Sequence, residues 1–125
     1  MKLTKGVEDY LEAIYVLASK KGVVRIKNIA EFLSVKLPSV TEAVKRLLEA
    51  GFVSHTPYGE VILTKKGKEI GKVTWDKHQL IYEFLKDILG VSDAVAFKEA
   101  CIIEHSISEE TKGKIKDFID KNRKE

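Results

Sequence analysis

The sequence is poor in cysteine and in long apolar runs. Cys101 is the only cysteine among 125 residues, so no internal disulfide can form, which fits a reducing compartment. No apolar run approaches the ~20 residues that span a bilayer. The first residues, MKLTKGVEDYLEAIYVL, are acidic where a signal peptide carries its apolar stretch. We therefore expect a cytoplasmic protein with no membrane partner.

Motifs typical of enzymes are also missing. The sequence has no His-Glu-x-x-His pair, no glycine-rich phosphate loop and no nucleophile beside a base. Internal repeats and low-complexity segments are absent as well. These absences argue against a metal-dependent hydrolase, and we expect neither enzymatic activity nor a small organic substrate.

Charge is distributed unevenly along the chain. Residues 1–70 contain 12 Lys and Arg against 8 Asp and Glu, a net charge of +4. Residues 71–125 contain 10 against 11, a net charge of −1, which together give the overall +3. A basic first half and a slightly acidic second half suggest different partners for the two halves. The alternative is a solvated Lys/Glu surface with no partner.

Apolar spacing and turn chemistry predict six helices and one hairpin. The predicted helices cover residues 7–20, 28–33, 37–51 and 65–89, then one segment beginning at Ser92-Asp93 and one beginning at Ser108. Thr64 is the expected N-cap of the long helix, and Pro57-Tyr58-Gly59 is the expected hairpin turn. In the third helix the predicted buried stripe is Val40, Val44, Leu47 and Leu48. The fold class is therefore mostly α with a small β-hairpin.

The order of helix, short helix, tight turn, helix and hairpin is typical of a winged helix-turn-helix, whose second helix enters the major groove of DNA. Ser39 and Thr41 can donate to phosphates or bases, and Glu42 can accept from a cytosine amino group. Arg25 and His55 are further backbone candidates. The predicted DNA-binding residues are Lys27, Lys36, Pro38, Ser39, Thr41, Glu42, Lys45, Arg46 and Tyr58. The alternative is a helix-turn-helix that binds no DNA.

The stretch EACIIEH places three possible metal ligands together. Cys101, Glu104 and His105 are spaced i, i+3 and i+4, so they share one face of a helix. A thiolate, a carboxylate and an imidazole form a ligand set for a transition metal. The alternative is that Cys101 is an inert core residue beside two polar neighbours.

Further polar residues interrupt apolar stretches elsewhere. Asp9 and Glu12, also spaced i, i+3, fall within the apolar pattern of the first helix, and His78 lies beside Leu80 and Ile81. Carboxylates and imidazoles next to apolar faces must be solvated, paired or bound to something. One cation would satisfy all of these groups together.

Over about residues 7–108, the chain resembles the DtxR/MntR family of metal-dependent transcriptional repressors. The resemblance is carried by EDYLEAIY, IAEFLSVKLPSVTEAVKRL, LTKKGKEIG, KHQL and CIIEHSIS, in that order. It implies a winged DNA-binding domain at residues 1–70 and a helical metal-binding and dimerisation domain at 71–125. It also implies a homodimer on a palindromic operator in double-stranded DNA, controlling metal homeostasis genes. The alternative is a winged-helix regulator without metal control.

The resemblance further implies a ligand set. By position the ligands are Asp9, Glu12, His78, Cys101, Glu104 and His105, holding one or two divalent ions per chain, Mn(II) or Fe(II). Asp9 and Glu12 resemble the manganese branch, whereas Cys101 resembles the iron branch. Tyr82 and Phe97 stand where the iron branch has ancillary-site ligands, so we expect no ancillary site, and the length leaves no room for the SH3-like domain of that branch.

Overall fold

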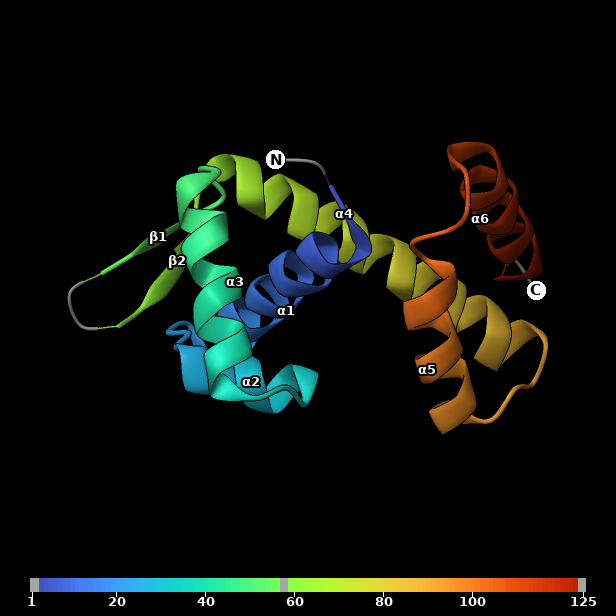
Figure 1. The fold of residues 1–125 in the computed structure, drawn as a ribbon. Coiled ribbons are helices and arrows are strands. Elements are labelled where there is room, and N and C mark those ends of the chain that lie inside the picture. The colour runs from blue at the N-terminus through green and yellow to red at the C-terminus, as the bar shows by residue number, and fades with distance from the viewer. Residues whose placement is uncertain (1–2, 57–58, 124–125) are drawn as a thin grey trace. The chain divides into compact units, whose positions relative to one another are not determined.

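The computed structural model describes residues 3–56 and 59–123 and divides into two compact units, Met1–Val73 and Thr74–Glu125 (Figure 1). Pro57 and Tyr58, including the predicted DNA contact at Tyr58, lie outside the described residues. The elements, in chain order, are α1 (Lys5–Lys21), α2 (Ile26–Leu33), α3 (Leu37–Glu49), β1 (Val53–His55), β2 (Val61–Leu63), α4 (Lys65–Glu83), η1 (Phe84–Ile88), α5 (Asp93–Ile103) and α6 (Glu109–Arg123).

The predicted fold class, mostly helical with a small β-hairpin, is confirmed. No helix within the described ranges is long and apolar enough to cross a membrane.

Helix α1 forms the centre of the first unit. Its N-terminus is capped by Thr4, whose Oγ1 accepts from the Val7 amide at 3.2 Å, and its end is marked by Gly22 at φ +83°. Leu11, Ile14 and Leu17 on α1 are buried in a core shared with α2, α3 and the hairpin. This packing gives the amphipathic face of α1 a partner, which stabilises a helix far more than intrinsic propensity does.

A tight turn joins α2 to α3 (Figure 1). Ser34 adopts the left-handed conformation at φ +56°, and the Val35 amide donates to the Ala30 carbonyl at 3.0 Å. Pro38 lies in the first turn of α3, where a missing N–H costs nothing. The predicted buried stripe of α3 is correct at Val40, Val44 and Leu47. It is wrong at Leu48, which is 44% exposed because it lies about 100° round the helix from Leu47.

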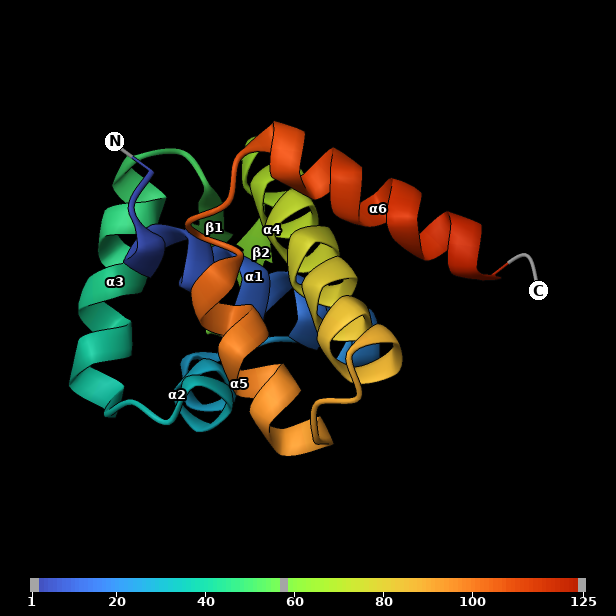
Figure 2. The ribbon, with the colours of Figure 1, turned by 90° about the vertical axis from the view of Figure 1, so that its right-hand side faces the viewer.

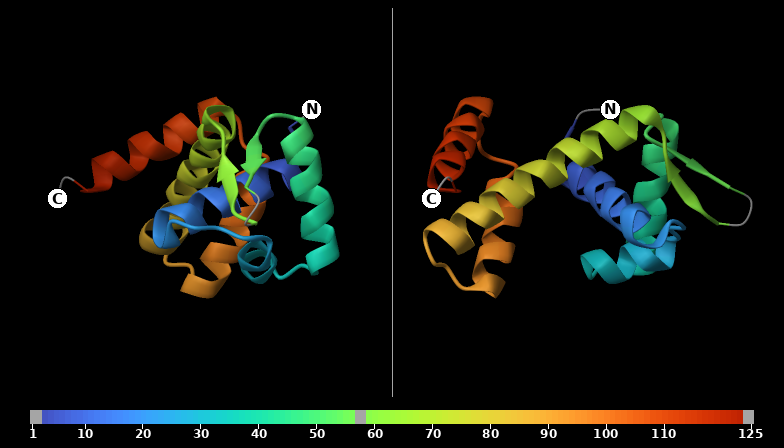
Figure 3. Two further views of the ribbon diagram at one scale, coloured as in Figure 1. Left: turned by 90° about the vertical axis from the view of Figure 1, so that its left-hand side faces the viewer. Right: turned by 180° about the vertical axis from the view of Figure 1, so that it is seen from behind.

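The wing is a two-stranded antiparallel hairpin in which Val53 pairs with Leu63 and His55 with Val61. Its second strand also bonds to the connection between α1 and α2, because the Val61 amide donates to the Val24 carbonyl at 2.7 Å. Figure 3 shows the hairpin from two further sides, extending from the helices of the first unit. The wing is thus held at its base by this hydrogen bond.

The start of α4 packs very closely on the rest of the first unit. Thr64 caps α4 as predicted, since its Oγ1 accepts from the Gly67 amide at 3.2 Å and donates to the Gly51 carbonyl at 2.7 Å. A Cβ added at Gly67 would lie 2.1 Å from the Phe52 carbonyl oxygen, and one at Gly71 would lie 2.6 Å from the Leu11 carbonyl oxygen. Only glycine fits at either position.

The second unit contains the later part of α4, η1, α5 and α6 (Figure 2). The prediction of one regular helix to residue 89 is wrong in detail, because the chain widens into a π-helical turn at η1 before it ends at Gly90, φ +76°. Both α5 and α6 pack against η1. Ser108 caps α6 as expected, its Oγ accepting from the Thr111 amide at 3.1 Å.

Candidate metal centre

Four of the six predicted ligands come from two neighbouring segments of the second unit. His78 lies on α4, and Cys101 lies in the last turn of α5. Glu104 and His105 were expected on the fifth helix, but that helix ends at Ile103: Glu104 is its C-cap and His105 follows in a turn. Glu104 keeps helical dihedrals and donates its amide to the Ala100 carbonyl at 3.0 Å, so the two side chains still project close together.

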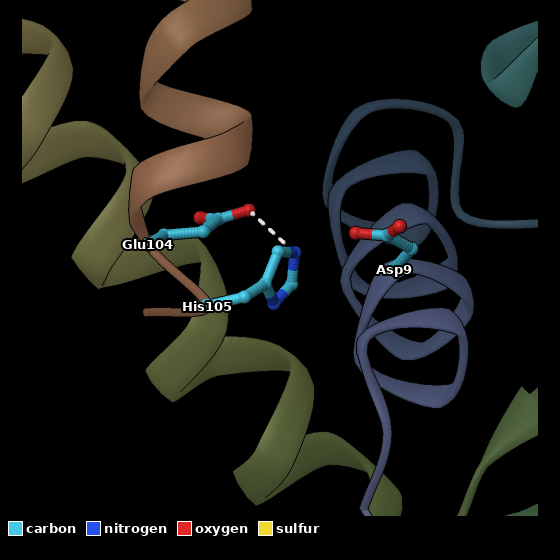
Figure 4. A group of neighbouring side chains, drawn as sticks. All are labelled: Asp9, Glu104 and His105. Carbon is cyan, nitrogen blue, oxygen red and sulfur yellow. Dashed lines mark ion pairs between the residues drawn. The ribbon is translucent and has the colours of Figure 1, made fainter. Parts of the chain in front are cut away.

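The side chains of these four residues meet in one cluster. His78 Nδ1 lies 3.6 Å from Cys101 Sγ and 3.8 Å from Glu104 Oε2. His105 Nε2 lies 3.4 Å from Glu104 Oε1, the pair drawn with a dashed line in Figure 4. One carboxylate therefore lies between two imidazoles, with a thiol beside the first of them.

Two members of the cluster, His78 and Glu104, are buried, whereas Cys101 and His105 are half-buried. His78 is 1% exposed and Glu104 is 2% exposed, and burial lowers the pKa of His78 from 6.5 to about 4. His78 is thus neutral at pH 7, the form in which an imidazole binds metal. Its Nε2 is buried and has no hydrogen-bond partner in the part of the chain that the structure describes. The other ring nitrogen, Nδ1, lies beside the Glu104 carboxylate and the Cys101 thiol, and an imidazole, a carboxylate and a thiolate together fit a divalent transition metal.

Aromatic rings surround His78 on its remaining sides. The Trp75 ring stacks on the imidazole, with centroids 5.0 Å apart and planes 11° from parallel. Phe97 meets it edge-on at 4.7 Å and 71°. Tyr82 lies farther out at 6.2 Å, and its hydroxyl bonds to Asp93. Tyr82 and Phe97 occupy the positions of ancillary-site ligands in the iron branch. Here they place aromatic rings near His78 instead of metal-binding groups.

The remaining predicted ligands, Asp9 and Glu12, belong to the first unit. They lie on α1, three residues apart and therefore on one face of the helix. Asp9 is half-buried and Glu12 is buried. Figure 4 also draws the Asp9 side chain on its helix.

The predicted DNA-contacting residues within the described ranges are all exposed. On and beside α3 these are Lys36, Pro38, Ser39, Thr41, Glu42, Lys45 and Arg46, with Lys27 on α2, Arg25 before it and His55 on β1. The Thr41 hydroxyl differs from expectation, because it donates to the Leu37 carbonyl at 3.0 Å. In this conformation the Thr41 oxygen can still accept a hydrogen bond, but its hydroxyl proton is donated to the Leu37 carbonyl and cannot also be donated to DNA.

Comparison with models of known protein families identifies the family of this chain. Residues 2–61 match the model of the iron dependent repressor N-terminal DNA-binding domain, and residues 64–125 match the model of its metal-binding and dimerisation domain. The chain belongs to the iron-dependent repressor family. Members of this family are transcriptional regulators, and this chain has both the DNA-binding domain and the metal-binding and dimerisation domain that define them. The predicted family is confirmed.

Individual relatives agree with this membership. An uncharacterized HTH-type transcriptional regulator of Methanocaldococcus jannaschii is 36% identical over 120 residues, covering 95% of this chain and 96% of the relative. The HTH-type transcriptional regulator MntR of Shouchella clausii is 40% identical over 116 residues, covering 93% of this chain and 80% of the relative.

Solved structures of iron-dependent repressor family proteins share the fold. The manganese regulator SloR matches with a TM-score of 0.80 at 34% identity, over 96% of this chain and 55% of that one. IdeR of T. acidophilum matches with a TM-score of 0.83 at 26% identity, also over 96% and 55%. The chain therefore spans about half the length of these solved proteins.

Sequence reasoning missed one part of the site, the rings around His78. Trp75 was not singled out, and Tyr82 and Phe97 were noted only as residues that are not ligands. The spacing of Trp75, His78 and Tyr82 at i, i+3 and i+7 was a usable signal, since it puts all three on one face of α4. No local sequence pattern could have predicted that Phe97 on α5 contacts His78.

Proposed function

We propose that this chain is a cytoplasmic, metal-activated repressor that binds a palindromic operator as a homodimer and controls metal homeostasis genes in response to Mn(II) or Fe(II). The observation that carries the proposal is the buried cluster of His78, Cys101, Glu104 and His105 inside a metal-binding and dimerisation domain. The names of solved neighbours support the choice of metal, because SloR is described as a manganese regulator and another neighbour as a manganese-dependent transcriptional repressor. No catalytic activity is part of the proposal.

The proposed ligand set joins the cluster to the carboxylates of α1. By the family resemblance, Asp9 and Glu12 of the DNA-binding domain complete the set that His78, Cys101, Glu104 and His105 begin. Six donors of these types could hold one or two ions per chain. Carboxylate oxygens suit Mn(II), whereas the Cys101 thiolate favours softer ions such as Fe(II).

The proposed mechanism follows from which domain supplies each ligand. We place the domain boundary near residue 70, so Asp9 and Glu12 belong to the DNA-binding domain and the other four ligands to the dimerisation domain. If the ligand set assembles as proposed, the carboxylates of Asp9, Glu12 and Glu104 would repel one another without a cation. Bound metal supplies positive charge there, and the six side chains that hold it would fix the recognition helix of each subunit relative to the dimer.

The DNA-contact proposal assigns roles by chemistry and exposure. Lys27, Lys36, Lys45 and Arg46 neutralise phosphates, and Ser39 at the start of α3 contacts phosphate or a base edge. Pro38, Thr41 and Glu42 lie on the same exposed side of α3 and face bases, where Glu42 accepts from a cytosine amino group. Tyr58 remains a proposed backbone contact from the wing.

An anaerobic calorimetric titration of the reduced apoprotein with Mn(II), and separately with Fe(II), tests the proposal. A parallel titration uses Cys101→Ser. Two Mn(II) per chain with little effect of Cys101→Ser would support a paired carboxylate site. One Fe(II), lost in Cys101→Ser, would support a single site selected by the thiol. Absence of binding by both metals would overturn metal control and leave only the DNA-binding part.

A further inference from the structure

The orientation of His78 is not fixed by the hydrogen bond that usually orients a metal-binding histidine. Such a histidine commonly donates its second N–H to a carboxylate or carbonyl outside the ligand set. Here Nε2 has no hydrogen-bond partner among the described residues. Nδ1 lies 3.6 Å from Cys101 Sγ and 3.8 Å from Glu104 Oε2, and both of those groups are proposed ligands themselves. The His78 ring must therefore be held by contacts with its faces and edges.

Two aromatic side chains act there. Trp75 lies one turn before His78 on α4 and stacks on it, 5.0 Å between centroids and 11° from parallel. Phe97, on α5, meets the imidazole at 4.7 Å and 71°, an edge-to-face arrangement. Contacts on a face and at an edge restrict rotation about both side-chain torsions of a histidine. Aromatic pairs of this geometry are favourable beyond the burial of their surface.

Tyr82 completes this arrangement from one turn farther along α4. Its ring meets Phe97 edge-on at 6.0 Å and 77°. Its hydroxyl bonds to Asp93 at the start of α5, and the Lys86 ammonium lies 5.5 Å from its ring centroid. Tyr82 therefore links α4 to the beginning of α5 and supports Phe97 against His78.

We propose that Trp75 and Phe97 are positioning residues that hold the His78 imidazole in the orientation from which it binds the metal. This inference rests on the proposed metal-binding function and adds residues that are not ligands. With the ring already fixed in the apoprotein, metal binding does not have to order it, which favours affinity. Loss of outer groups that orient ligands typically costs 10–100-fold in metal affinity, so loss of the Phe97 ring is expected to weaken binding about tenfold.

The test compares three variants at half-exposed phenylalanines. Phe97→Leu removes the ring and keeps an apolar side chain, and Phe97→Tyr restores the ring. Phe118→Leu is the matched control, because Phe118 is 48% exposed against 46% for Phe97. Phe118 also meets an aromatic ring edge-on, Phe84 at 6.1 Å and 79°. Mn(II) affinity is measured by calorimetry, and the oligomeric state and apoprotein melting temperature of each variant are recorded.

The expected result is a loss of Mn(II) affinity of about tenfold in Phe97→Leu, with wild-type affinity in Phe97→Tyr and Phe118→Leu. Unchanged affinity in Phe97→Leu would overturn the inference while leaving the metal function intact. Equal losses in Phe97→Leu and Phe118→Leu would overturn it too, because general loosening would explain both. If the wild type itself binds no metal, the proposed function fails, an outcome distinct from these.

A second measurement does not depend on a variant that folds. The imidazole ¹H resonances of the wild-type apoprotein are recorded by NMR, with His55 on the exposed wing as the internal reference. The stacked Trp75 ring should shift the His78 protons upfield of the His55 protons. His78 resonances at the positions of an exposed histidine would overturn the proposal.

Discussion

At the residue scale, Glu104 is the group on which the candidate centre depends most. Its carboxylate is buried, and it lies 3.4 Å from His105 Nε2 and 3.8 Å from His78 Nδ1. A buried carboxylate is costly unless positive charge or hydrogen bonds compensate it. A divalent ion held beside it would supply that charge, so changing Glu104 should affect metal binding more than any other single change.

Glu104→Gln keeps the shape of the side chain and removes its charge. Mn(II) affinity should fall by more than about tenfold, the lower limit typical for loss of a group that merely orients a ligand. Calorimetry measures the affinity, with Glu99→Gln as the control, since Glu99 is an exposed glutamate on α5. An equal loss in both variants would show that net charge, and not the position of Glu104, governs binding.

Residue by residue, the sequence was more informative about ligands than about packing. Ligand candidates could be recognised because polar groups interrupt apolar stretches, as at His78. Leu48 was misassigned because adjacent helix positions differ by about 100°, and the spacing alone does not say whether one or both of two adjacent leucines are buried. The contact of Phe97 with His78 joins residues 19 positions apart, and no local pattern encodes it.

At the element scale, α4 matters because it runs through both units. Its first turns lie against the first unit at Gly67 and Gly71, and its later part carries Trp75 and His78. The start of α4 could be predicted from sequence because Thr64 is a recognisable N-cap. The start of α1 was predicted two residues late, because its cap Thr4 was not recognised. The π-helical turn η1 and the end of α5 at Ile103 could not be predicted, since tertiary packing sets them.

Gly67→Ala should lower the free energy of unfolding of the apoprotein by about 2–3 kcal/mol, because a Cβ 2.1 Å from the Phe52 carbonyl forces backbone to move. Gly113→Ala is the matched control. Gly113 lies within α6, and a Cβ there meets nothing within 4 Å, so that change should stabilise by about 0.5–1 kcal/mol. Urea titration measures both, and similar stability of the two variants would contradict the close packing of α4.

The exposed side of α3 gives a second prediction at this scale. Arg46→Ala should weaken binding to the operator and reduce the slope of log K against log salt by about 1, because one phosphate contact is lost. Lys116→Ala on α6 is the control for charge, since its Nζ lies 4.0 Å from Asp120 on the same helix. A salt slope that Arg46→Ala leaves unchanged would remove Arg46 from the DNA interface.

At the scale of the whole molecule, the proposed metal ligands come from both the DNA-binding domain and the dimerisation domain. The family models match both domains, one for DNA and one for metal and dimerisation, and the proposed ligands are drawn from each. Metal and DNA should then influence each other's affinity by the same factor, since coupling between binding sites is reciprocal. Coupling free energies of this kind are typically about 1–3 kcal/mol, or roughly 5–150-fold.

The most direct test of the central claim is the DNA affinity of the reduced protein with and without metal. Fluorescence anisotropy would be measured on an operator selected by the protein from a random-sequence library, first with Mn(II) or Fe(II) and then after a chelator. The account predicts binding about 5–150-fold tighter with metal, reversed by the chelator and absent in Glu104→Gln. Equal affinity in all of these conditions would contradict it and identify a winged-helix regulator that works without metal.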